Sequence, residues 1–287
     1  KSHVRFRKER EPTTARVRAL IFIGFTLSLS FAFEALLISK GGLGAFGQPG
    51  VMVLMWLPGL VAIVLTLVWR GSLKELGLSW GTRRAWVAAL LVPAACGAFT
   101  YGMALATGLV HFSPPEQALE EGRASLGHWA TGLPMQLGLG TLIGSMFALG
   151  EELGWRGYLV PRLLEARAHQ ALLLSGLIWG LWHLPMILWG DYATSSQPAL
   201  SAIQFMATVT LAAVFFGWLR LQSGSVLPPM LGHAVHNVVY QRVFDKWFDG
   251  PQESFFAGEQ GLFSMLAYGF VAWMVMRQMK PAAPEAA

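Results

Sequence analysis

The chain has 287 residues, of which 54% are apolar and 13% charged, and its formal net charge is +5 at pH 7. A charged fraction about half that of an ordinary soluble domain argues against a water-soluble globular protein. The 12 Trp and 18 Phe residues are typical of wide lipid-facing and interfacial surfaces. These figures predict an all-α fold, a polytopic membrane helix bundle.

Eight apolar runs follow one another along the chain, each near the roughly 20 residues that a membrane-spanning helix needs. They cover residues 19–39, 51–69, 85–107, 134–160, 170–189, 200–221, 225–244 and 261–277. The fourth and seventh runs contain most of the charged and imidazole groups, which weakens their hydropathy. We expect one transmembrane bundle over 19–277, a basic tail at 1–18 and a second tail at 278–287.

Lys and Arg are distributed unevenly over the two sides that eight spans define. Seventeen fall on the side of the N-terminal tail, whereas Lys40, Arg123, Arg242 and Lys246 fall on the other. Because Lys and Arg accumulate in cytoplasmic loops, both termini are predicted to be cytoplasmic. The single cysteine, Cys96, lies in an apolar run, and we expect it to be a buried, unreactive thiol.

Two connecting segments have some expected structure of their own. Residues 72–81 are too short and polar to span, and they fit an interfacial segment or a plain loop. The connection from 110 to 134 carries Glu116, Glu120 and Glu121, and we expect a solvated helical turn there.

Ionisable side chains at membrane depth are energetically costly, so they face the bundle interior and mark function. In this chain they are Glu34, Glu151, Glu152, Arg156, His183, His233 and His236, with Asn237 as a neutral polar neighbour. Glu34, in the first expected span, has no partner that the sequence identifies. It is equally compatible with facing the same cavity as the others and with pairing elsewhere.

The first cluster of such residues is the segment Gly150-Glu151-Glu152-Leu153-Gly154-Trp155-Arg156. Adjacent residues on a helix point about 100° apart, so the two carboxylates cannot do the same job. Glu152 precedes Arg156 by four residues, the favourable order for an ion pair. Glu151 then has no partner on its own helix, which favours a catalytic role for it, whereas a structural clamp is the favoured interpretation for Glu152 and Arg156.

Two further polar clusters follow on later spans. Trp179 and His183 lie one turn apart on one face, although a lone histidine on an apolar helix is more often a core residue. His233 and Asn237 also share a face, while His236 points elsewhere. Two aligned donors suit stabilisation of an oxyanion, but for this cluster taken alone an interhelical hydrogen-bonded pair is the favoured interpretation.

Depth in the membrane connects the three clusters. With a rise of about 1.5 Å per residue, Glu151, His183 and Asn237 lie ~18–20 Å from the cytoplasmic ends of their spans, and His233 lies ~12 Å in. Three separate helices therefore place polar groups in one layer. Unrelated structural polar residues would not be expected to coincide in this way.

The three clusters, in this order, resemble the CPBP family of intramembrane proteases, which includes the CAAX prenyl endopeptidases and the bacterial Abi-type relatives. The family pattern EExxxR is matched by Glu151, Glu152 and Arg156. FxxxH is matched from Trp179 to His183, with Trp in place of the usual Phe. HxxxN is matched by His233 and Asn237. The resemblance covers about residues 145–240.

The resemblance implies an intramembrane glutamic endopeptidase that needs neither metal nor cofactor, with a catalytic core over about 134–244. Glu151, helped by His183, would activate a water molecule, and His233 and Asn237 would stabilise the oxyanion. Glu152 and Arg156 would position the site, and Trp179 would pack beside the glutamate as Phe does, so that this replacement is expected to be mild. The chemistry of amide hydrolysis, which needs a base, an acid and oxyanion donors, agrees with that assignment.

Two alternatives stay open at this point. His183, His233 and a carboxylate could ligate zinc in a membrane hydrolase, although no His-Glu-x-x-His motif is present. A non-enzymatic scaffold, immunity protein or transporter is the other alternative. For the protease, the expected partners are the lipid bilayer and a peptide or membrane-protein substrate, with a CAAX-like C-terminus or a leader peptide as candidates. No nucleic-acid partner is expected, and the expected location is the bacterial inner membrane.

Overall fold

The fold is described from a computed structural model, in which residues 11–168, 170–193 and 195–279 are placed. The main helices are α1 (Pro12–Ser39), α2 (Gly47–Val68), α3 (Arg83–Ala106), α5 (Leu126–Met135), α6 (Thr141–Glu152), α7 (Val160–Glu165), α8 (Ala171–Leu188), α9 (Pro198–Ser223), α10 (Leu227–Val238) and α12 (Leu262–Gln278). Two short helices, α4 (Glu116–Glu120) and α11 (Glu253–Phe256), and two-residue strands β1 (His111–Phe112) and β2 (Phe248–Asp249) lie between them. The strands pair antiparallel, His111 with Asp249.

Helical segments of other types interrupt or extend this set. Short 3₁₀ segments cover Leu43–Phe46 and Leu73–Leu76. Wider π-helical segments cover Gln136–Gly140, Leu153–Leu159 and Val239–Phe244. The first two π segments join α5, α6 and α7 into one continuous helix of 40 residues. Since π segments are rare and often mark functional sites, the two that flank α6 draw attention to its glutamates.

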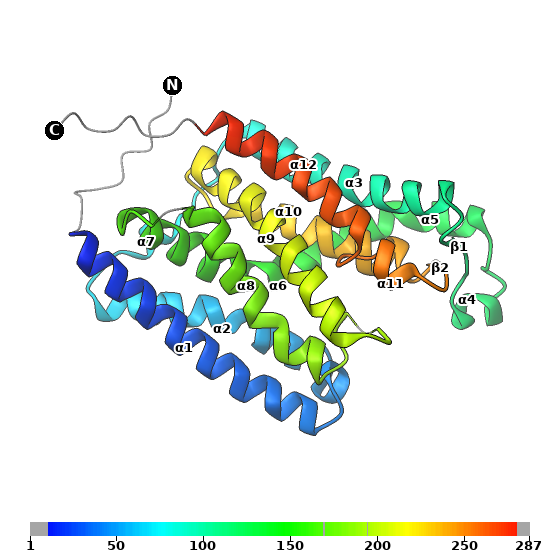
Figure 1. The fold of residues 1–287 in the computed structure, drawn as a ribbon, viewed down its shortest axis with the longest axis horizontal. Coiled ribbons are helices and arrows are strands. Elements are labelled where there is room, and N and C mark those ends of the chain that lie inside the picture. Colours follow the sequence, from blue (N-terminus) through cyan, green and yellow to red (C-terminus); the bar gives the residue numbers. More distant parts are fainter. Residues whose placement is uncertain (1–10, 169, 194, 280–287) are drawn as a thin grey trace.

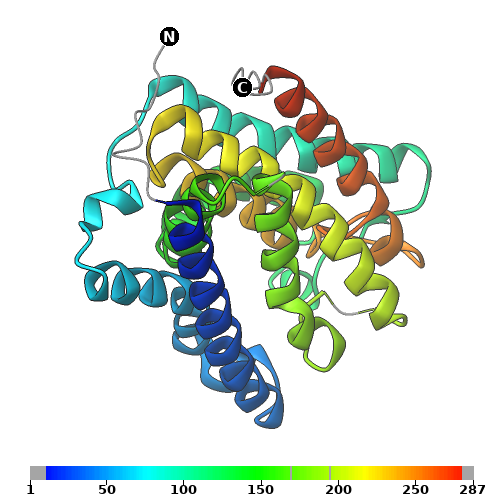
Figure 2. The same ribbon diagram turned by 60° about the vertical axis from the view of Figure 1, so that its left-hand side comes forward.

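The helices form an elongated bundle in which α6, α8, α9 and α10 lie between two outer groups (Figures 1 and 2). Helices α1 and α2 cover one side, where α1 packs on α2 and α8, and α2 packs on α6. Helices α3 and α12 cover the other side, against α9 and α10. The central helices therefore contribute side chains to an interior that protein surrounds, which is where polar groups in a membrane protein belong.

Within the described residues, six helical stretches are long and apolar enough to cross a membrane: α1, Leu43–Val68, α3, Leu126–Glu165, α8 and α9. The predicted all-α polytopic bundle is confirmed, but the count of eight spans is not reached by length and composition. The seventh expected run forms α10 and the π segment that follows it, and the eighth forms α12. The polar residues of α10 lower its hydropathy, and α12 has 17 residues.

The expected boundary of the fourth span needs correction, whereas the tail boundaries stay predictions. The fourth span, expected at 134–160, runs from Leu126 to Glu165, because the helix continues through Pro134. The first helix begins at Pro12, inside the expected tail 1–18, and residues 1–10 lie outside the described part of the chain. Gln278 ends α12, and the remainder of the tail from 280 is likewise outside it.

The structure agrees with the expectations for the two connecting segments and for Cys96. Residues 116–120 form the expected helical turn, and Cys96 is buried and free. In the segment 72–81, the 3₁₀ turn buries Leu76, while Trp80 is 78% exposed. That arrangement fits the expected interfacial segment, which packs one face on the bundle and exposes an aromatic ring on the other.

Backbone contacts fix α2 against the helix that carries the two glutamates. A Cβ atom on Gly59 would lie 2.5 Å from the carbonyl oxygen of Gly150, and one on Gly150 would lie 2.6 Å from the Cα of Trp56. Only glycine permits helices to approach this closely. The indole of Trp56 adds a hydrogen bond to the carbonyl oxygen of Met146 at 2.9 Å. Helix α2 is thereby held beside the end of α6.

Candidate active site

Glu151 lies at the end of α6, buried and held by two indole groups. Its Oε2 atom accepts hydrogen bonds from Nε1 of Trp179, at 2.7 Å, and from Nε1 of Trp155, at 3.3 Å. Trp155 is on the same continuous helix, so the expectation that Glu151 has no partner there is wrong. An indole four residues along the helix can donate to a carboxylate just as a guanidinium can, and the charge pattern alone does not reveal such a bond. Trp179 also does more than Phe could, because a phenyl ring has no N–H to donate.

Glu152 is the centre of a buried charged network. Its Oε1 atom accepts from Nη1 of Arg156 at 2.8 Å, which confirms the predicted ion pair. The same oxygen accepts from Nδ1 of His233 at 2.9 Å. Glu152 thus connects the first cluster to the third, across α6 and α10. Since a buried charge needs both pairing and hydrogen bonds, this network holds the two helices in one relative position.

Arg156 is fully buried and also contacts aromatic rings. Its guanidinium carbon lies 4.1 Å from the ring centre of Trp179 and 5.2 Å from that of Phe216. A cation over the face of an indole is attracted by the ring's quadrupole, an effect worth about 2 kcal/mol or more when it is desolvated. The guanidinium therefore stabilises the ring whose N–H faces Glu151.

His183 has a defined tautomer. Its Nδ1 atom lies 2.9 Å from the carbonyl oxygen of Trp179. A carbonyl oxygen only accepts, so Nδ1 carries the hydrogen and Nε2 is the basic nitrogen. The ring packs edge-on against Trp182, at 4.6 Å, and stacks on Tyr192, at 5.6 Å between centres. These neighbours fix the plane of the imidazole.

One cavity of about 80 Å³ brings the candidate catalytic residues together. Glu151 from α6, His183 from α8, and His233 and Asn237 from α10 all line it. The predicted convergence of three helices in one layer is thus present. Another part of its wall comes from α1, α2 and the turn between them, and it consists of Glu34, Leu43, Val51, Leu54 and Met55. Of the two possibilities left open for Glu34, the structure shows the first, because it faces the cavity of Glu151.

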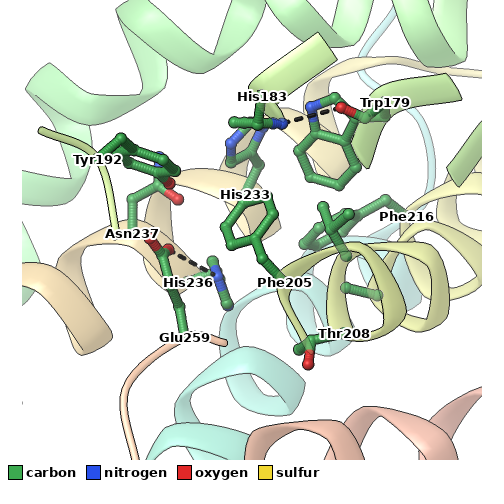
Figure 3. Close-up of a pocket in the computed structure, with 12 residues that line it drawn as sticks. Trp179, His183, Tyr192, Phe205, Thr208, Phe216, His233, His236, Asn237 and Glu259 are labelled. Atoms are coloured by element: carbon green, nitrogen blue, oxygen red, sulfur yellow. Dashed lines mark hydrogen bonds and ion pairs between the residues drawn. The ribbon is translucent and has the colours of Figure 1, made fainter. Parts of the chain in front are cut away.

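A narrower cavity of about 20 Å³ adjoins the first, since His183, Tyr192, His233 and Asn237 line both. Figure 3 shows His236 and Glu259 at one end of it and the hydrogen bond from His183 to the carbonyl of Trp179 at the other. His236 contacts Glu259, with 3.5 Å between Nε2 and Oε2, and its Nδ1 lies 2.8 Å from the hydroxyl of Tyr268. His236 therefore belongs to a neighbouring polar group and not to the face of His233.

Glu259 is held as an ionised carboxylate by that group. It lies in the connection between α11 and α12, and Nε2 of Gln241 donates to its Oε2 at 3.2 Å. Burial raises the pKa of Glu259. Hydrogen bonds and charge from His236, Tyr192 and Gln241 lower it by a larger amount, so that the pKa lies below its ordinary value. Sequence reasoning missed both Glu259 and Tyr192, because neither belongs to an expected span or to a spaced motif.

Comparison with known proteins gives the second line of evidence. Residues 133–239 match the family described as "Type II CAAX prenyl endopeptidase Rce1-like". This segment contains all three motifs. The resemblance to the CPBP family is confirmed. Over 93 residues the chain is also 28% identical to "CAAX prenyl protease 2" of Methanococcus maripaludis, a match that covers 31% of this chain and 34% of that protein. The chain thus spans about a third of the length of this relative, and the family match leaves α1 to α3 and α12 outside.

Proposed function

We propose that this chain is a CPBP-type intramembrane endopeptidase that hydrolyses a peptide bond with a water molecule activated by Glu151. The observation that carries the proposal is the shared cavity, in which a carboxylate, two imidazoles and a carboxamide from three helices meet. The Rce1-like match over the same residues supports it.

In this mechanism Glu151 is the general base. Both indole donors bind Oε2, so the hydrogen bonds described for Glu151 leave Oε1 available for a water. The carboxylate takes one proton from the water, and the resulting hydroxide adds to the carbonyl carbon of the scissile bond. His183, whose Nε2 is the basic nitrogen, assists the transfer of that proton to the leaving amine. Base and proton-carrier catalysis of this kind typically contributes about 10²–10⁴-fold.

His233 and Asn237 stabilise the tetrahedral oxyanion. The hydrogen on Nδ1 of His233 points at Glu152, so Nε2 can donate only when the ring is an imidazolium. Glu152 is the counter-ion that stabilises this cation. Asn237 supplies a second, uncharged donor from the same face of α10.

The substrate class follows from the part of the cavity wall that α1, α2 and the turn between them form. Leu43, Val51, Leu54 and Met55 make that wall largely apolar, which suits an apolar or lipid-modified peptide. We propose a CAAX-like C-terminus, a leader peptide or a membrane-protein segment as substrate. We further propose eight spans, cytoplasmic termini and a location in the bacterial inner membrane.

The test uses purified protein in detergent and short internally quenched peptides, one set with a farnesylated cysteine and one set unmodified. Glu151→Ala and His183→Ala are expected to lower kcat by about 10²-fold or more, because each removes a proton-transfer group. Thermal unfolding of the variants checks that they remain folded. Cleavage by Glu151→Ala at the wild-type rate would refute the proposal.

Two further measurements complete the assignment. Incubation with a chelator, followed by metal analysis, separates the glutamate mechanism from a zinc hydrolase: activity that is lost together with a bound metal contradicts the former. Proteomic comparison of cells that contain the wild-type or the Glu151→Ala protein then identifies the natural substrate by its accumulation.

A further inference from the structure

Glu34 on α1 is a buried carboxyl group that no described residue satisfies. Its side chain is 0% exposed, and neither Oε1 nor Oε2 has a hydrogen-bond partner among the described residues. It lines the cavity of Glu151 together with Leu43, Val51, Leu54 and Met55, which are all apolar. No motif of the Rce1-like match includes α1, so nothing assigns a role to this residue.

An unpartnered buried polar group lowers the stability of a protein, and it costs less once a ligand satisfies it. A lone charge would cost more still, and a second carboxylate facing the cavity of Glu151 would add like-charge repulsion. Such a site favours the neutral acid form of Glu34, which presents one O–H donor and one carbonyl acceptor.

A donor and an acceptor side by side match the backbone of an extended peptide. In an extended chain, the N–H and C=O of one residue point to the same side, as in the hydrogen-bonded pairs of antiparallel sheets. The carboxyl group can therefore accept from the N–H and donate to the C=O of a single substrate residue. The other side chains on that part of the wall, Leu43, Val51, Leu54 and Met55, are apolar and offer the substrate backbone no hydrogen bond.

We propose that Glu34 is a substrate-positioning residue, which binds the backbone of an extended peptide from the part of the cavity wall that α1 contributes and so sets the scissile bond against the base. This inference rests on the proposed function. Glu34 takes no part in bond making or breaking, and its contribution is to binding and register.

The variants that test it are Glu34→Leu, Glu34→Gln and Ser30→Ala. Leucine removes both hydrogen-bonding groups, whereas glutamine keeps one donor and one acceptor. Ser30 is the matched control, because it is a buried polar residue one turn earlier on α1 whose hydroxyl has no described partner and which lines neither of the two cavities above. Binding of the fluorescent peptides is measured on the Glu151→Gln background, so that the contact is measured without cleavage.

We expect Glu34→Leu to weaken peptide binding by about 3- to 10-fold, the loss of one or two hydrogen bonds. Glu34→Gln and Ser30→Ala should bind as the parent does. Glu34→Leu should also unfold at the same or a higher temperature, because it removes an unsatisfied group. A structural role predicts the reverse, a lower unfolding temperature with unchanged binding, and that result would overturn the proposal.

A second measurement identifies the contact on the substrate. Peptides methylated at one backbone nitrogen at a time are bound to the parent protein and to the Glu34→Leu variant. At one position, methylation should weaken binding to the parent but not to the variant. Equal penalties at every position in both proteins contradict a backbone contact with Glu34. Cleavage that survives Glu151→Ala would instead reject the glutamate mechanism, and it would leave these binding results standing.

Discussion

The replacement of Trp179 by phenylalanine tests how the base is held. The family usually has Phe at this position, and the sequence alone suggested that either ring would serve. The structure places Nε1 of Trp179 2.7 Å from Oε2 of Glu151, a hydrogen bond to the proposed general base. After Trp179→Phe, Glu151 retains the weaker indole bond from Trp155 at 3.3 Å.

The size of the effect follows from the bond that is lost. A hydrogen bond to a charged group contributes about 1.5–3 kcal/mol. Because the bond fixes where the carboxylate points, its loss misplaces the base, and at about 1.36 kcal/mol for each factor of ten this lowers kcat by up to about 10- to 150-fold. The variant should keep KM within a few-fold of the wild type, because the indole orients the base and does not bind the peptide. Steady-state cleavage of the internally quenched peptides provides both constants.

Trp182→Phe is the matched control. Trp182 is on the same helix, is buried and lines the cavity of Glu151, but its Nε1 has no hydrogen-bond partner among the residues that the structure describes. Its replacement removes the same atoms without removing a bond to Glu151. Equal losses of kcat in Trp179→Phe and Trp182→Phe would show that ring volume matters and that the hydrogen bond does not.

Three more predictions concern stability, each measured by thermal unfolding in detergent. Glu152→Gln should destabilise the fold by about 3–5 kcal/mol, since it leaves buried cationic partners uncompensated; no change would argue against the network. Gly150→Ala should cost about 1–3 kcal/mol because its Cβ would lie 2.6 Å from the backbone of α2, whereas Gly144→Ala, with 3.6 Å of room, is the tolerated control. Glu259 has a lowered pKa, so its carboxylate stabilises the fold above the unfolded value of about 4.3, and this contribution is lost as the pH falls below that value. In Glu259→Gln the unfolding temperature should fall less at low pH than in the wild type. An equal fall in both proteins would contradict this role of the carboxylate.

The motifs on the central helices were predictable because helical spacing fixes which residues share a face. Glu152 and Arg156 pair as their i,i+4 separation requires, and His233 and Asn237 line one cavity. What the spacing could not show is the link from Glu152 to His233, because it depends on how closely α6 and α10 pack. The indole bonds to Glu151 are not predictable for a different reason. A Trp on a membrane helix can pack against its neighbours or donate a hydrogen bond, and the sequence does not distinguish these two roles.

The remaining differences come from the path of the chain in three dimensions. The fourth span starts earlier than expected because the helix passes through Pro134, and the π segment that follows at Gln136–Gly140 provides a wider turn there. Tyr192 and Glu259 reach the site from connections between helices. The positions of such connections follow from the assembled bundle and have no periodic signal in the sequence.

The π segment that follows the two glutamates sets the relation between the reaction and the lipid. All seven of its residues, Leu153–Leu159, are buried, although a helix at the border of a bundle would expose one side. Protein encloses this turn completely, so acyl chains never touch the residues that support Glu151. Bilayer thickness and headgroup composition can therefore influence where a substrate enters, whereas the electrostatic surroundings of the base are set by the polypeptide alone.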